Sequence, residues 1–173
     1  MKLNKILMFI WVLSLTACGF HLRGVDGNYQ FPYRSIYLDC NVDAICPSLK
    51  KTIINQNLAT IVTSKESAEA IVTVGDEYTN RENSNFNAVG QISGIKLTYG
   101  VTARVYNKSG IQEMPDIMAK SSSTINYNNS LILSASQEEQ TAWSDLHDDV
   151  INIIIRRIVY SHPYMGSSNA ESQ

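Results

Sequence analysis

Three cysteines are the most reactive side chains of this 173-residue sequence, and their positions indicate two kinds of thiol chemistry. Cys18 directly follows Leu15-Thr16-Ala17, an apolar residue and then two small ones. This pattern, called a lipobox, suits transfer of diacylglycerol to the thiol, cleavage before the cysteine and acylation of the new amine. Cys40 and Cys46 lie much further along the chain, six residues apart. Their spacing suits a reaction between two thiols.

The first seventeen residues have the order of a secretory signal. Lys2 and Lys5 form a basic end, and residues 6–15 are apolar apart from one serine. That run matches a signal core and is too short to span a membrane. We therefore expect a signal peptide over residues 1–17, with Cys18 as the lipid-modified first residue of the mature chain. Two or more acyl chains anchor stably, and Gly19 favours the outer membrane. We expect the anchored domain on the periplasmic side of that membrane.

Cys40 and Cys46 would then be the two remaining cysteines, in an oxidising compartment. The spacing favours a local disulfide, with two buried free thiols as one alternative and a metal site as another. The metal site is disfavoured because no histidine or further cysteine lies nearby. We expect no metal ion and no cofactor.

The mature chain has the length of one domain and a modest negative charge. Removing residues 1–17 takes away Lys2 and Lys5, which leaves 12 basic and 16 acidic side chains and a formal charge near −4. Overall basicity therefore gives no support for nucleic-acid binding. An anionic ligand would have to meet a local cluster of basic residues.

Hydrophobic periodicity predicts an α+β domain over residues 33–160. It follows a lipidated N-terminus and tether over residues 18–32 and precedes a disordered tail over residues 161–173. Two-residue alternation and helical spacing predict the order β-α-β-β-β-α, with 79–91 as a polar loop. The expected strands are 33–39, 68–78, 95–105 and 111–127, and the expected helices are 47–60 and 137–160. Ser136 and Glu139 have the spacing of a capping box at the start of the second helix.

These elements predict a two-layer sandwich, with both helices on one face of a four-stranded, mostly antiparallel sheet. The clearest strand alternates over eleven residues, and its second row is polar: Lys96, Thr98, Gly100, Thr102, Arg104 and Tyr106. We expect this row on the uncovered face. Residues 121–124, Ser-Ser-Ser-Thr, are predicted to point outward as well.

The heptapeptide Cys18 to Gly24 has the sequence CGFHLRG and opens the expected mature chain. It resembles the start of the mature chain in the LptE family of lipopolysaccharide-assembly lipoproteins. The resemblance continues in the alternating strand from Leu97 to Val105. It returns at Glu139-Gln140 and at Arg156-Arg157, near the two ends of the last helix.

The resemblance implies a function that composition cannot show. LptE proteins lie at the outer membrane largely inside LptD, a large β-barrel, help it to assemble, and help to pass lipopolysaccharide to the outer leaflet. It implies barrel contacts on the polar surface of the domain, for which Asn87, Thr102 and Ser122 are candidates. Family members contact lipopolysaccharide phosphates through basic residues, but the matching stretches 85–88 and 134–136 contain none. Arg81 and Lys96 flank the same end of the sheet and are candidate replacements, unless both are solvated surface charges.

Other classes of function fit the sequence less well. We expect no enzyme, because the three histidines are scattered and no phosphate-binding, zinc-protease or nucleophile-elbow motif is present. The main alternative is a stand-alone periplasmic lipoprotein that binds lipid or cell-wall material without a barrel partner. A pull-down from outer membranes separates the two hypotheses.

Overall fold

The computed structural model describes residues 31–126 and 132–161. The predicted signal peptide, Cys18 as the predicted lipid-attachment residue, most of the predicted tether and residues 162–173 of the predicted tail lie outside these residues. The elements follow in the order β1 (Ser35–Cys40), α2 (Cys46–Asn55), β2 (Thr60–Ile61), the short 3-10 helix η2 (Lys65–Ser67), β3 (Ala70–Phe86), β4 (Ile92–Asn107), β5 (Ile117–Asn126) and α3 (Ile132–Ser161).

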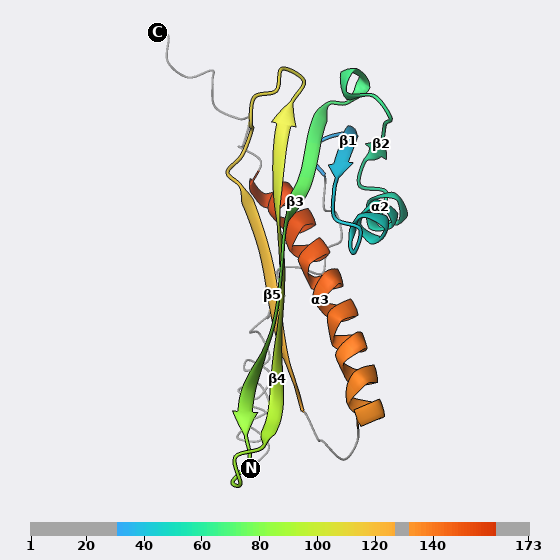
Figure 1. Ribbon diagram of the computed structural model, residues 1–173. Helices are drawn as coiled ribbons and strands as arrows, with labels where there is room; N and C mark the ends of the chain where they lie inside the picture. Colours follow the sequence, from blue (N-terminus) through green and yellow to red (C-terminus); the bar gives the residue numbers. More distant parts are fainter. Residues whose placement is uncertain (1–30, 127–131, 162–173) are drawn as a thin grey trace, which may run out of the picture.

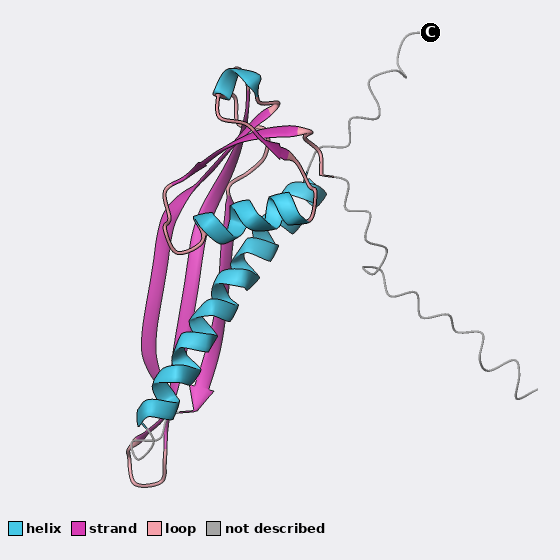
Figure 2. Ribbon diagram, turned by 90° about the vertical axis from the view of Figure 1, so that its right-hand side faces the viewer, coloured by secondary structure: helices cyan, strands magenta, loops and turns pink. Residues whose placement is uncertain are grey.

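The strands form one mixed sheet in the order β2-β1-β3-β4-β5. β1 is parallel to both β2 and β3, whereas β4 is antiparallel to its two neighbours, β3 and β5. Both helices cover the same face of this sheet (Figures 1 and 2). The prediction of an α+β fold with two helices on one face is confirmed. The sheet has five strands rather than four, because Thr60 and Ile61 pair with the start of β1 after α2 has ended.

The main departure from the expected elements is the length of β3. The polar residues 79–86, expected in a loop, continue the strand and pair with β4 as far as Phe86 opposite Ile92. Only residues 87–91 form the turn. Polar, asparagine-rich sequence has low strand propensity, but here the neighbouring strand supplies the backbone hydrogen bonds. Residues 83–94 form a two-stranded projection at the lower end of Figure 1, and we call it the hairpin arm.

A β-bulge divides β3 between Gly75 and Tyr78. Asp76 has a φ of 52° there, and the extra residue puts Gly75 and Asp76 on the same face, so that the alternation of β3 shifts by one residue. Asp76 reaches Arg104 on the uncovered face. Glu77 accepts a hydrogen bond from the Tyr99 hydroxyl, which belongs to the buried row of β4.

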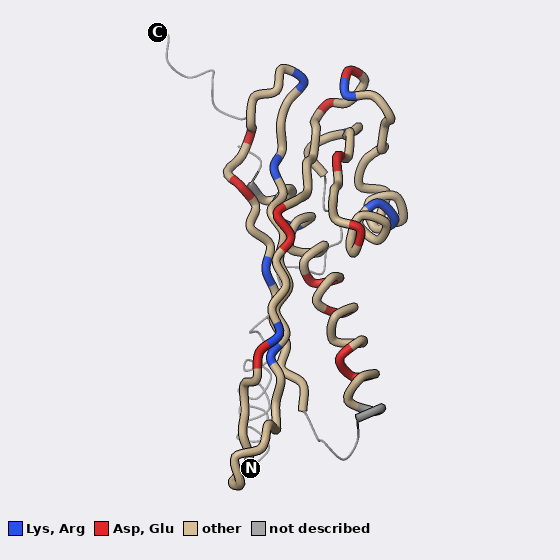
Figure 3. The backbone as a smooth tube through the Cα atoms, in the orientation of Figure 1, with Lys and Arg blue, Asp and Glu red and all other residues tan. Residues whose placement is uncertain are grey.

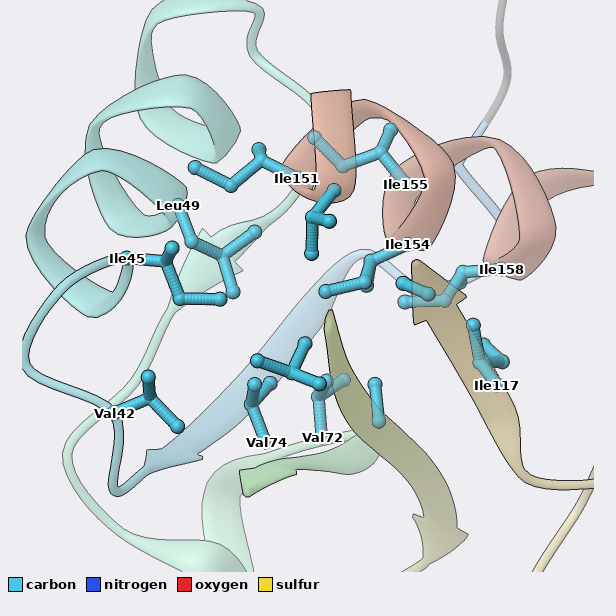
Figure 4. Close-up of a cluster of buried hydrophobic side chains, with 14 of the residues drawn as sticks. Val42, Ile45, Leu49, Val72, Val74, Ile117, Ile151, Ile154, Ile155 and Ile158 are labelled. Atoms are coloured by element: carbon cyan, nitrogen blue, oxygen red, sulfur yellow. The ribbon is translucent and has the colours of Figure 1, made fainter. Parts of the chain in front are cut away.

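The core lies between the sheet and the two helices. The apolar row of β4 is almost fully buried, as expected, at 3% exposure or less: Ile95, Leu97, Tyr99, Val101, Ala103 and Val105. Leu49 of α2 and Ile154 of α3 pack over Val72 and Val74 of β3 (Figure 4). Because the core draws on all the long elements, this part of the chain has one hydrophobic centre.

Two local predictions at the helices are wrong. α2 ends at Asn55 rather than near residue 60, and Asn57 just beyond it has a φ of 53°. α3 begins at Ile132, so Ser136 and Glu139 lie inside the helix and form no capping box. Glu139 instead binds Arg81 of β3 across the layers. A Ser-x-x-Glu spacing places both side chains on one helix face, where a tertiary partner can use them.

Candidate functional site

The uncovered face of the sheet is the candidate functional site, and we call it the outer face. It consists of the side chains of β3, β4 and β5 that point away from the helices. Its central row comes from β4, as predicted, and Thr98 in that row is only 5% exposed although no helix covers it. The register explains this burial, because Asn80 and Ser122 flank Thr98 on the neighbouring strands.

Most of the charge on the outer face is matched within the face. The Lys96 ammonium lies 3.5 Å from a carboxylate oxygen of Glu82, directly across the strand pair. The Arg104 guanidinium binds Asp76 at 2.7 Å and Asp116 at 2.9 Å. A hydrogen bond from Gln112, and to a smaller extent one from Arg104, holds the pKa of Asp116 below its ordinary value. The side chains are partly solvated, so each pair adds little stability, but Lys96 and Arg104 each have a carboxylate partner.

Lys120 is bound differently, by an aromatic ring. Tyr78, Gly100 and Lys120 occupy opposed positions on three adjacent strands. The Lys120 ammonium lies 5.0 Å from the centre of the Tyr78 ring, within cation–π range. A Cβ on Gly100 would lie 3.1 Å from the Ala119 carbonyl oxygen and 3.5 Å from the Lys120 Cβ. The missing side chain therefore leaves room for lysine and tyrosine to meet above the strand.

The three residues predicted to contact the barrel lie in two separate parts of the domain. Thr102 and Ser122 lie on the outer face, while Asn87 lies in the turn of the hairpin arm. The Asn87 side-chain oxygen accepts hydrogen bonds from the amides of Val89 and Gln91, and Gly90 supplies the φ of +79° that closes the turn. The expectation that all of residues 121–124 point outward is wrong. Ser121 faces α3, where its hydroxyl donates to Asp149.

Arg81 and Lys96, the candidate phosphate contacts, are not brought together. Arg81 opposes Leu97 and points toward the helices, where it forms two hydrogen bonds to the Glu139 carboxylate, at 2.8 and 3.1 Å. Lys96 lies on the outer face beside Glu82. The two cations therefore occupy opposite faces of the sheet, and each has a carboxylate neighbour. No single phosphate group can bridge them through the sheet.

Of the alternatives for Cys40 and Cys46, the structure contains the disulfide. The bond joins the end of β1 to the first residue of α2, with the two Cα atoms 5.7 Å apart. The Val42 amide also donates to the Cys46 sulfur. Ile45, at the N-cap of α2, forms no side-chain hydrogen bond, so the disulfide and Pro47 define the start of this helix.

A second polar cluster lies on the helix side of the sheet. The Tyr99 hydroxyl donates to Glu77 at 2.9 Å, and the His147 ring of α3 packs edge-on to Tyr99 with ring centres 4.3 Å apart. Burial and the Glu77 hydrogen bond raise the pKa of Tyr99, and burial lowers that of His147. Both rings therefore stay neutral at pH 7. Within the described residues, no group of histidine, cysteine and acidic side chains has a metal-binding arrangement.

Sequence analysis alone did not identify the residues that pair with Arg104, Tyr99 and Gly100 of β4. Asp76, Glu77 and Tyr78 were expected at the end of a short strand, and Lys120 was not singled out. Their roles depend on the bulge in β3 and on the register across three strands. The only local sign of the bulge in β3 was the sequence Gly75-Asp76-Glu77, because a glycine followed by two acidic residues is unusual inside a strand and a bulge accepts unusual backbone angles.

Comparison with known families identifies this architecture. The model of the family described as "LptE: Lipopolysaccharide-assembly" matches residues 33–158, which is nearly all of the described chain. The chain belongs to the LptE family. The resemblance seen in the sequence is thereby confirmed for the domain, while the heptapeptide from Cys18 to Gly24 lies outside the matched residues. No curated protein matches the chain.

Solved structures share the LptE-family fold at low sequence identity. The uncharacterized lipoprotein B of Nitrosomonas europaea has a TM-score of 0.65 and 21% identity, over 82% of this chain and 90% of that one. A minor lipoprotein of Acinetobacter baumannii has a TM-score of 0.60 and 16% identity, over 73% and 91%. The rare lipoprotein B of Shewanella oneidensis has a TM-score of 0.56 and 13% identity, over 72% and 90%. No helix in the described residues of our chain combines the length and apolar character of a membrane span.

Proposed function

We propose that this protein is an outer-membrane lipoprotein that occupies the lumen of an LptD-type barrel, helps the barrel to assemble and assists delivery of lipopolysaccharide to the outer leaflet. Anchoring would come from acyl chains on Cys18. The role is that of a binding protein and not of an enzyme. Membership of the LptE family supports the proposal, and the observation that carries it is the charge-matched outer face.

Charge matching is what a buried polar interface requires. Removing water from an unpaired charge costs several kcal/mol, whereas small neutral polar groups can bond to a polar wall. On the outer face, Lys96 and Arg104 each have a carboxylate within 3.5 Å. Between them lie Thr98 and Thr102, with Ser122 on the next strand. A partner could cover this central section without separating Lys96 or Arg104 from its carboxylate, while Lys120, opposite Gly100, keeps its contact with the Tyr78 ring.

The hairpin arm adds a second supporting feature. Residues 83–95 contain no charged side chain (Figure 3), and the arm extends past the start of α3. Phe86 and Val89 near its tip are 62% and 78% exposed. An isolated two-stranded hairpin is marginally stable in water. A surrounding lumen would support the arm, and the uncharged tip could enter it at little electrostatic cost.

Photo-crosslinking in living cells tests the proposal. A photoreactive amino acid at Thr102, Ser122 or Asn87 should capture the LptD-type barrel. The same group at Ser67 in η2 is the matched control, because η2 lies at the opposite end of the domain from the arm (Figure 1). We expect strong crosslinks from the first three positions and weak ones from Ser67.

A charge substitution on the outer face tests how strongly the barrel is bound, which crosslinking does not measure. Ser122→Glu would place an unpaired carboxylate on the outer face and should lower recovery of the barrel complex more than tenfold, since tenfold corresponds to only about 1.4 kcal/mol. Gln140→Glu adds the same charge on the exposed side of α3 and should leave recovery unchanged. Capture of only soluble periplasmic proteins or peptidoglycan, with normal surface lipopolysaccharide after depletion, would refute the proposal. The stand-alone lipoprotein would then be favoured.

A further inference from the structure

A basic cleft lies between β5, one of the two edge strands of the sheet, and the C-terminal half of α3. It has a volume of about 650 Å³. Its lining combines three cations with three apolar or aromatic side chains and includes no carboxylate: Met118, Lys120, Ile153, Arg156, Arg157 and Tyr160. We call it the β5–α3 cleft.

The cations of this cleft differ from three basic residues elsewhere on the domain that are paired with carboxylates. Lys65, Lys96 and Arg104 each lie within 4 Å of a carboxylate. Over residues 31–126 and 132–161, neither arginine of the cleft has such a partner. Lys120 contacts the Tyr78 ring, which leaves its charge unneutralised. The cleft is therefore a local positive site on a mature chain whose formal charge is near −4.

The apolar members of the lining are unusually exposed. Met118 is 71% exposed and Tyr160 is 68% exposed, and they flank the three cations. Long basic side chains beside an exposed aromatic ring are typical of membrane–water interfaces, where cations meet headgroups and the ring enters the interfacial layer. On a surface that only contacts water, an exposed aromatic ring beside basic side chains would contribute no binding energy. The ligand chemistry that fits it is an anionic headgroup attached to an apolar chain.

The position of the cleft agrees with that chemistry. β1 begins at the end of the sheet where β4 finishes, and the Tyr33 hydroxyl bonds to Glu113 in the segment before β5. The N-terminal segment therefore joins the domain at the end of the sheet where α3 also ends (Figure 1). Twelve residues lie between Cys18 and Phe31, and the thirteen Cα-to-Cα steps of that segment span at most about 45 Å. Acyl chains on Cys18 would keep this end of the domain within reach of the bilayer surface.

We propose that the β5–α3 cleft binds anionic phospholipid headgroups at the surface of the membrane that holds the lipid anchor. Arg156 and Arg157 contact the phosphates, and Tyr160 enters the interface. The contact orients the domain so that the hairpin arm points away from the bilayer surface. This inference does not depend on the barrel partner, because it concerns the opposite end of the domain.

Vesicle co-sedimentation tests the inference with the mature chain, residues 18–173. Cys18→Ala removes the acyl chains, so that only the folded surface contributes to binding. The probes are vesicles of phosphatidylcholine alone and vesicles that also contain phosphatidylglycerol. Each basic residue at an anionic surface contributes about 1 kcal/mol, or about fivefold in partitioning. The double change Arg156→Gln with Arg157→Gln should therefore lower the partition coefficient on phosphatidylglycerol vesicles about 30-fold.

A matched control removes the same charge elsewhere. Lys50→Gln with Lys51→Gln alters two cations of α2 and should change partitioning less than about twofold. Tyr160→Ser should weaken binding without abolishing its dependence on phosphatidylglycerol. Circular dichroism and thermal unfolding identify any variant that does not fold.

Three results would overturn the inference. The first is equal binding of the wild-type chain to both vesicle types, or no binding to either. The second is an equal loss from the two double variants, which would indicate only general electrostatics. The third is release by inorganic phosphate at matched ionic strength, which would indicate a site for free anions. Barrel crosslinks from Ser122 that persist in the arginine double variant would separate this site from the barrel contacts.

Discussion

Replacing both Cys40 and Cys46 by alanine is expected to lower the free energy of unfolding by about 2 kcal/mol. The two residues are six apart, and the bond excludes extended conformations of that short loop from the unfolded chain. For a loop of this length, the chain-entropy relation corresponds to about 2 kcal/mol at 25 °C. In a domain of this size, that difference lowers the melting temperature by roughly 8 °C.

Urea unfolding, followed by circular dichroism, measures this difference directly. The wild-type chain should be compared with and without reductant, because reduction breaks the bond without removing either sulfur. The double alanine variant then reports any additional packing loss, since both cysteines are half-buried. Without the bond the unfolded chain is less compact, so the dependence of unfolding free energy on urea should become steeper.

Reductant must have no effect on the double alanine variant, which is the internal control. The reasoning is refuted if reduced and oxidised wild-type chains unfold at the same urea concentration. It is also refuted if either cysteine is labelled in the denatured chain without reductant. A loss well above 4 kcal/mol would show that contacts of the sulfurs in the native state dominate over the chain entropy.

Three further expectations follow from the contacts across the two layers. Tyr99→Phe should lower the free energy of unfolding by about 1 kcal/mol in urea, because Glu77 loses a buried donor but can still reach water; no change would mean that water replaces the donor fully. Burial lowers the pKa of His147 from its ordinary 6.5, so this imidazole binds a proton more tightly in the unfolded chain than in the folded one. Stability should therefore fall as the pH drops through and below 6.5, and the His147→Gln variant should show a flatter dependence; parallel curves would contradict the argument. A double-mutant cycle on Arg81 and Glu139 should give a coupling below about 1 kcal/mol, because the arginine side chain is 47% exposed, and a value above 2 kcal/mol would contradict this estimate.

Much of the fold follows from local sequence because the signals repeat. Alternation from Ile95 to Val105 predicted which side chains of β4 are buried, and the structure buries that row almost completely. The apolar stripe of α3 likewise predicted a long helix against the sheet, although its start was placed five residues too late. Spacing restricted Cys40 and Cys46 to a few alternatives. Each of these signals lies within one short stretch of the chain, so the local sequence is enough to detect it.

The site required information that no single element contains. The polar half of β3 is a strand because β4 supplies its hydrogen bonds, and its own residues favour a loop. Arg81 and Lys96 look alike in sequence, but pairing turns one toward Glu139 and the other toward Glu82.

The sequence by itself determined the α+β class, the buried row of β4, the short list of alternatives for the two cysteines and the resemblance to LptE. Tertiary structure alone decided the charge-matched outer face, the length of the hairpin arm and the basic cleft beside β5. The physical reason is register. Shifting a strand by one residue sends every side chain to the other face, and the bulge at Asp76 makes such a shift within β3. Register is set by pairing between segments far apart in the chain, and local composition carries little information about it.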